Sequence, residues 1–335
     1  MNVAGRRGAR VVAPRRDECD GIGVTLERLC ALQIHARRLD LQGLSVPPVE
    51  PGGGHRSRFR GRGMEYVESR AYLAGDDIRS MDWRVTARSG RPHTKLYREE
   101  SERRVFLLVD LGPSMQFGTR RSFKSVVAAE TAALMCWATV QHGDRLGALV
   151  SDGARRLQVR DRKGRSGALS VLQALATLGQ AGRRTPAWNG SSLRQALRQA
   201  RRIIRPGTLV TVISDFAALD AETEQEFARL GRHNQVLVTL VYDPLEESPP
   251  PPGRYAVTDG REVAVFDTRT AALRVAYTDY FEQRRQRLQV LAVRLGMTLI
   301  SLRTDAEPAE DLVRGLTGQV ARAAHRPGSR GKRVV

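Results

Sequence analysis

The chain has 335 residues, of which 41% are hydrophobic and 27% are charged, a composition typical of a folded globular protein and not of a disordered one. No apolar run approaches the roughly 18 residues that a membrane-spanning helix needs, so we expect no membrane insertion. The cysteines, Cys19, Cys30 and Cys136, have no CxxC spacing. They argue against a zinc module or a disulfide framework and predict a cytoplasmic location.

The net charge is strongly positive, because 55 basic residues outweigh 36 acidic ones and give +19 at pH 7. Both ends of the chain are rich in arginine, and we interpret residues 1–21 as a flexible basic arm and residues 321–335 as a basic tail. Such a charge favours an acidic partner. A nucleic-acid-associated basic protein is therefore an alternative function, although the sequence has no helix-turn-helix, RNA-recognition or zinc-finger signature.

Residues 22–104 are predicted to form a helix followed by a small, β-rich accessory domain. Leucines recur at helical spacing over residues 24–41, and Thr25 is the expected N-cap of this helix. Residues 43–63 are rich in proline and glycine, which indicates a loop or linker. The segment 64–104, dense in polar and aromatic residues, then leads into the next domain.

From residue 105 the pattern changes to alternating strands and helices, which we assign to a second domain over residues 105–320. Strands that are apolar throughout and alternate with helices predict an α/β fold, with a mostly parallel, Rossmann-like sheet and helices on both faces. The expected strands are 105–110, 144–150, 155–160, 208–213, 235–242 and 297–302. The expected helices are 122–140, 166–178, 190–204, 221–232, 268–295 and 306–323, with a hairpin at 254–266.

Polar side chains follow two of these strands. The run VFLLVD ends in Asp110 with Ser114 in the next turn, the run VTVISD ends in Asp215, and Ser191 lies in a polar segment that opens a helix. Ligands of open α/β sheets bind at the carboxyl ends of the strands. Two carboxylates and two hydroxyls form an all-oxygen set that suits Mg²⁺ or Mn²⁺. Both aspartates are also typical helix N-caps or turn residues, an interpretation that needs no metal.

This constellation resembles the von Willebrand factor A domain and its metal-ion-dependent adhesion site. The family pattern is Asp-x-Ser-x-Ser after the first strand, a Thr in a later turn and an Asp after a later strand. The resemblance implies metal ligation by Asp110, Ser114, Ser191 and Asp215, with Ser191 in place of the Thr. Gly112 stands where the pattern has its first Ser, so the site is degenerate at one hydroxyl ligand.

Two apolar side chains beside this turn are candidate partner contacts. Met115 is predicted to add an apolar contact to a partner at the site. For Phe117 we favour packing in the core beneath the loop.

The segment before the second domain carries another ordered pattern. It reads GRGMEYVESRAYLAGDDIRSMDWRVTAR, in which Asp76, Asp77 and Arg79 belong to Gly-Asp-Asp-x-Arg-x-x-Asp-Trp. Together with the glycine-rich turn before it and the strand with Asp and Ser-Met after it, this set resembles the bacterial "domain of unknown function 58" family over about residues 24–320.

The acidic part of this pattern has two interpretations. Arginine–carboxylate pairs can tie the segment together, with Trp83 and Tyr72 as buried anchors. Alternatively, Asp76, Asp77 and Arg79 form an exposed partner contact or a second ion site.

The family resemblance implies a partner. The chain is similar to A-domain components encoded beside MoxR-type AAA+ ATPases, which are thought to form chaperone-like or assembly systems with them. We therefore predict a non-enzymatic protein-interaction module that serves as partner or adaptor of such an ATPase. An enzyme is disfavoured because the sequence has no GxSxG, Walker A, HExxH or strand-linked GxGxxG motif, and its histidines are scattered.

Overall fold

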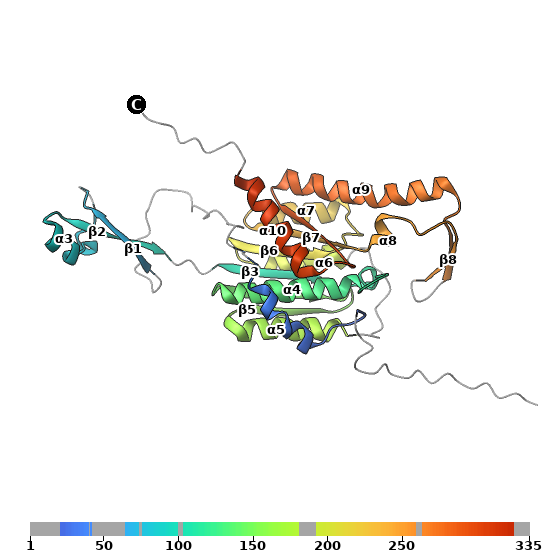
Figure 1. Ribbon diagram of the computed structural model, residues 1–335, viewed down its shortest axis with the longest axis horizontal. Coiled ribbons are helices and arrows are strands. Elements are labelled where there is room, and N and C mark those ends of the chain that lie inside the picture. Colours follow the sequence, from blue (N-terminus) through green and yellow to red (C-terminus); the bar gives the residue numbers. More distant parts are fainter. Residues whose placement is uncertain are drawn as a thin grey trace, which may run out of the picture. The chain divides into compact units, whose positions relative to one another are not determined.

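The computed structural model describes residues 21–39, 41, 64–73, 76–99, 103–180, 192–258 and 263–324. The chain divides into two compact units, one formed by residues 1–49 and 104–335 and the other by residues 50–103. The larger unit is an α/β domain with helices on both faces of a six-stranded sheet (Figure 1). The fold class predicted from the sequence is therefore confirmed.

The central sheet has the strand order β10-β7-β6-β3-β4-β5. Strands β10, β7, β6, β3 and β4 are parallel, and β5 at one edge runs antiparallel to β4. Parallel strands place their carboxyl ends at the same edge of the sheet, where α/β proteins bind their ligands. The strands are β3 (Arg104–Asp110), β4 (Arg145–Ser151), β5 (Arg156–Lys163), β6 (Thr208–Ser214), β7 (Gln235–Tyr242) and β10 (Thr298–Arg303).

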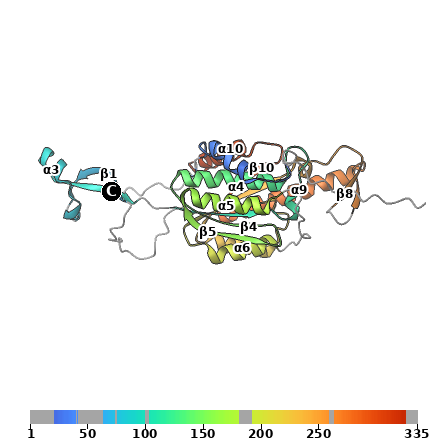
Figure 2. The same cartoon turned by 90° about the horizontal axis from the view of Figure 1, so that it is seen from below.

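The sheet separates two hydrophobic cores, because successive residues of a strand point to opposite faces. Val105, Leu107 and Val109 of β3 pack in one core, and Phe106 and Leu108 pack in the other. Helices α4, α5 and α10 cover the first face, and α6, α7 and α9 cover the second (Figure 1, Figure 2). These helices are α4 (Lys124–Gln141), α5 (Gly164–Leu178), α6 (Ser192–Ile203), α7 (Ala221–Gly231), α9 (Ala271–Leu295) and α10 (Pro308–Ala324).

The predicted N-terminal helix forms two short helices, α1 (Leu26–Ala31) and α2 (Gln33–Ala36). α1 packs on α4 and α5, and the Trp137 indole donates a hydrogen bond of 3.0 Å to the Leu29 carbonyl. This pair belongs to the larger unit, whereas the sequence grouped it with the accessory domain that follows. Helices this short are marginal alone, so they gain their stability by burying their leucines against the larger core.

The smaller unit contains a two-stranded antiparallel sheet of β1 (Met64–Ala71) and β2 (His93–Glu99). Between the strands lie a 3-10 turn, η1 (Ile78–Ser80), and a helix, α3 (Trp83–Ser89). α3 begins after Asp82, whose carboxylate accepts two backbone N–H groups of its first turn and caps the helix.

A hairpin of β8 (Arg254–Thr258) and β9 (Val263–Asp267) lies between the short helix α8 (Pro244–Glu247) and α9. The hairpin was predicted from the sequence. It contacts α9 through Phe266 and Tyr277, whose ring centroids are 5.3 Å apart.

Candidate functional site

The carboxyl ends of β3 and β6 lie side by side, because the two strands are parallel neighbours. β3 ends in Asp110, and Asp215 directly follows Ser214, the last residue of β6. After β3 the chain makes the 3-10 turn η2 (Pro113–Met115), which contains Ser114. These side chains line one small cavity of about 20 Å³. The structure thus brings together three of the predicted ligands.

Ser191, the fourth predicted ligand, lies outside the described residues. The next residue, Ser192, begins α6 and lines the same cavity. Its hydroxyl oxygen is buried without a hydrogen-bond partner in the described part of the chain. The cavity has room for about one water molecule.

Both carboxylate oxygens of Asp110 accept hydrogen bonds from within the chain. Oδ1 accepts from the Gly112 backbone N–H at 2.9 Å, and Oδ2 accepts from the Ser214 hydroxyl at 2.8 Å. A Cβ atom on residue 112 would lie only 3.0 Å from Oδ1 of Asp110. A side chain at this position would therefore require the carboxylate or the loop to shift by a few tenths of an ångström.

Asp215 is held by a buried lysine. The Lys124 ammonium lies 2.7 Å from Oδ2 of Asp215 and 2.9 Å from Oε1 of Glu246, and its side chain is 2% exposed. Oδ1 of Asp215 accepts from the Ser114 hydroxyl at 3.2 Å and from the Ala217 backbone N–H at 3.1 Å. Each of the four carboxylate oxygens of the site thus accepts at least one hydrogen bond from the protein itself.

The backbone after Asp215 adopts a conformation that is rare for a bulky residue. Phe216 has a φ of 52° and is fully buried, with its ring 6.1 Å from that of Phe227. Such a left-handed residue costs about 1 to 3 kcal/mol and persists only where its surroundings impose it. Here the packing of the ring holds the turn that orients Asp215.

The charges in this cluster shift pKa values in opposite directions. Burial, together with the negative charge of Asp215, raises the pKa of Asp110 from 3.8 to about 6. Burial also acts to raise the pKa of Asp215, but the Lys124 ammonium outweighs it and holds that pKa below its ordinary value. For Lys124, burial acts to lower the pKa, whereas Asp215 and Glu246 raise it above its ordinary value. Lys124 and Asp215 therefore form a charged pair at neutral pH.

The arrangement of the Asp110 and Asp215 carboxylates does not fit the predicted Mg²⁺ or Mn²⁺. Every carboxylate oxygen of Asp110 and Asp215 already accepts a hydrogen bond, and an ammonium contacts the second of these groups. Gly112 supplies no hydroxyl. In the described part of the chain no cluster of three or more His, Cys, Asp or Glu side chains has metal-binding geometry.

Lys124, Glu246 and Ser214 are the members of the site that sequence reasoning missed. A signal for the first existed, because Lys124 is one of four lysines in a chain whose cations are otherwise arginine, and it opens a long apolar helix. Glu246 and Ser214 carry no comparable signal. Their roles follow from contacts between distant segments.

The two apolar side chains beside the site are placed opposite to expectation. Met115 is fully buried, so its predicted role in partner contact is wrong. Phe117 is 38% exposed, and its ring centroid lies 5.9 Å from the Lys124 ammonium. The short turn η2 directs Met115 inward, which leaves Phe117 as the apolar surface of this loop.

In the smaller unit, the acidic pair serves the local backbone. Asp76 accepts from the Arg70 guanidinium at 2.7 Å and from the Leu73 backbone N–H at 2.9 Å. Asp77 caps η1 by accepting the backbone N–H of Arg79 at 3.0 Å. Both aspartates thus have a structural role. The exposed partner contact predicted for Asp76, Asp77 and Arg79 stays a prediction, and the side chains of Asp77 and Arg79 are exposed.

Trp83 is not the buried anchor that one interpretation required, because it is 67% exposed. α3 contacts β2 through Thr86, whose hydroxyl accepts the His93 backbone N–H at 3.0 Å. Tyr72, the second proposed anchor, is half-buried.

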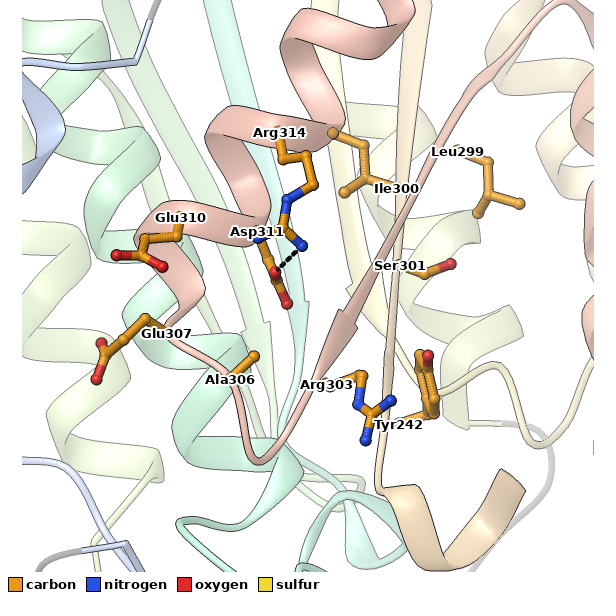
Figure 3. Close-up of a pocket in the computed structure, with 11 residues that line it drawn as sticks. Tyr242, Leu299, Ile300, Ser301, Arg303, Ala306, Glu307, Glu310, Asp311 and Arg314 are labelled. Carbon is orange, nitrogen blue, oxygen red and sulfur yellow. Dashed lines mark hydrogen bonds and ion pairs between the residues drawn. The ribbon is translucent and has the colours of Figure 1, made fainter. Parts of the chain in front are cut away.

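A larger groove of about 590 Å³ lies between β10 and α10, away from this site (Figure 3). Four of its five charged side chains form ion pairs within the chain, among them Arg314 with Asp311 at 3.0 Å and Arg303 with Asp305 at 3.0 Å. Its lining contains neither histidine nor cysteine. The groove therefore offers no evident reactive group.

Fold and strand-end site together define an α/β domain with polar side chains gathered at the carboxyl ends of β3 and β6. The family model described as "Protein of unknown function DUF58" matches residues 68–287. The chain belongs to this family. The uncharacterized proteins Mb1516 of Mycobacterium bovis and Rv1480 of Mycobacterium tuberculosis are each 34% identical to it over 263 residues, which are 78% of this chain and 81% of each relative.

Solved structures are similar to this chain at low sequence identity. BatB of Bacteroides thetaiotaomicron, a conserved hypothetical protein, is 16% identical, with a TM-score of 0.38 over 66% of this chain and 99% of that chain. A von Willebrand factor type A protein of Catenulispora acidiphila is 14% identical, with a TM-score of 0.38 over 69% and 44%. An aerotolerance-related membrane protein of Bacteroides fragilis is 15% identical, with a TM-score of 0.38 over 66% and 99%.

The cytoplasmic location predicted from the sequence is contradicted by these neighbours. The Bacteroides fragilis protein is described as a membrane protein, and a further neighbour from Vibrio fischeri as membrane-spanning. Among the described helices, none combines the length and the apolar character that crossing a bilayer requires. Cysteine spacing reports on redox chemistry and not on attachment to a membrane, so the cytoplasmic prediction is not retained.

Proposed function

We propose that this chain is a non-catalytic protein-interaction module whose strand-end surface binds a protein partner. The observation that supports it best is the half-exposed Phe117 ring, which lies beside a polar cluster whose carboxylates are all satisfied internally. A general base or nucleophile needs a group free to act on a substrate. Asp110 and Asp215 are committed to neighbours of the chain instead. An exposed aromatic side chain is a typical anchor of a protein interface.

The partner we propose is a MoxR-type AAA+ ATPase, with this chain as its adaptor in a chaperone-like or assembly system. This proposal rests on the family resemblance. It agrees with the absence of a Walker A motif from the sequence, since ATP-driven work would then come from the partner. The exposed Arg79 of the smaller unit remains a second proposed contact.

Affinity capture from lysate with the full chain as bait tests this function. We expect recovery of an AAA+ ATPase by the wild type and at least a tenfold loss with Phe117→Ser. Val293→Ser is the matched control, because Val293 is an exposed apolar residue (66%) on α9. Equal capture by wild type and Phe117→Ser would contradict the proposed surface. Recovery of nucleic acid that is lost as salt rises would favour the alternative function.

A further inference from the structure

The polar cluster at the strand ends contains its own cation. We infer that the Lys124 ammonium supplies the positive charge that a divalent metal ion supplies in a metal-dependent adhesion site, and that this surface therefore acts without a metal. The part of this inference that concerns partner binding rests on the proposed function. The part that concerns the metal does not.

The contacts of Lys124 show how it holds the site together. Its ammonium bonds to Asp215 after β6 and to Glu246 in α8, and lies over the Phe117 ring of the loop after β3. One charged group thus connects α8 with the two loops that follow β3 and β6 at the carboxyl edge of the sheet. Arg284 of α9 adds a second cation 3.4 Å from Glu246. Removing one partner from a buried ion pair is strongly destabilising, so this cation is a fixed part of the fold.

The charge of Lys124 opposes a divalent ion at Asp215. One oxygen of this carboxylate binds the ammonium at 2.7 Å, and the other accepts from Ser114 and Ala217. A metal ion bound to Asp215 would compete with these donors for the carboxylate oxygens. It would also meet the repulsion of a buried like charge, which is strong at such short range.

Two further observations point the same way. Gly112 supplies no hydroxyl ligand, and its backbone N–H holds Oδ1 of Asp110 on the loop that follows β3. The cavity beside these groups measures about 20 Å³, whereas Mg²⁺ usually retains several of its waters. A single water fits there, and the Ser192 hydroxyl lacks a partner that such a water would provide.

A site with a built-in ammonium has a different binding mode. A metal ion offers an open coordination position to a carboxylate of the partner. Lys124 offers none, because it is buried and engaged by two carboxylates. Recognition at this surface would then depend on the Phe117 ring and the loop around it, and it would not respond to chelation.

The decisive experiment measures metal binding by the purified full chain without any partner. Mn²⁺ is titrated and the free ion is followed by electron paramagnetic resonance, and thermal unfolding is compared in Mg²⁺ and in EDTA. For the wild type we expect no saturable Mn²⁺ site and the same unfolding midpoint in both solutions. Saturable binding of one Mn²⁺ that disappears in Asp215→Asn would overturn the inference.

Variants at the lysine provide the converse test. In Lys124→Met the carboxylates of Asp215 and Glu246 lose their cation, so we expect a lower midpoint that rises with Mg²⁺ concentration, as any ligand of the native state produces. Arg160→Met, at an exposed cation on β5, is the control and should behave as the wild type. A Lys124→Met variant that folds and ignores Mg²⁺ would refute the exchange of cations. If it fails to fold, the wild-type titration still decides.

Discussion

The buried carboxylate of Asp110 provides the sharpest test of how the strand-end site is built. We predict that Asp110→Asn increases the free energy of unfolding above neutral pH. Asparagine keeps an acceptor for the Gly112 backbone N–H, and its amide can donate to the Ser214 hydroxyl oxygen, so both hydrogen bonds of Asp110 are retained. The substitution removes a buried charge that is repelled by Asp215.

The magnitude follows from the pKa of Asp110. Its rise from 3.8 to about 6 means that the folded state binds the proton more tightly than the unfolded chain does. The stability contributed by this group therefore falls as pH rises from 3.8 through 6, and its full cost is present above pH 6. A shift of this size corresponds to about 3 kcal/mol at pH 8 and to roughly half of that at pH 5.

Urea unfolding of the wild type and Asp110→Asn at pH 5 and pH 8 measures this difference. We expect the variant to be more stable at both values and the gain to be larger at pH 8. Asp243→Asn is the matched control, because Asp243 is a third carboxylate at a strand end and directly follows β7. It accepts from the Thr119 hydroxyl at 2.6 Å and from the Thr119 backbone N–H at 2.9 Å, and these bonds hold its pKa below the ordinary value against the effect of burial. It should lose stability. A loss of stability in Asp110→Asn at pH 8 without metal would refute the reasoning.

Two further predictions concern packing and capping. Gly315→Ala should destabilise the larger unit by about 1 to 3 kcal/mol, because a Cβ there would lie 2.6 Å from Cγ2 of Ile300. Thermal unfolding measures this loss. An unchanged unfolding midpoint would show that α10 does not pack on β10 in this way. Asp82→Ala removes the cap of α3 and the acceptor of the Ser69 hydroxyl and should cost about 1 kcal/mol. Hydrogen exchange should then accelerate in α3 while β3 stays protected, and unchanged protection in α3 would contradict the capping role.

Local sequence patterns were sufficient to predict the order of strands and helices. They also predicted that Asp110 and Asp215 lie close together. Runs that are apolar throughout indicate strands buried on both faces, and parallel strands present their carboxyl ends at one edge. The same logic placed Ser114 beside the two aspartates, because a turn that directly follows a strand stays at that strand's end.

The ion pairs and the exposure of single side chains depended on the tertiary structure. Lys124 is 91 residues from Asp215 and 122 from Glu246, so no local pattern predicts their contact. Met115 and Phe117 are two positions apart, yet the fold of the turn buries one and exposes the other. The amino-acid sequence by itself determined which polar side chains lie together at the carboxyl edge of the sheet. Whether they hold a metal ion or a lysine is set by packing, because only the assembled core brings α4 and α8 onto the end of β6.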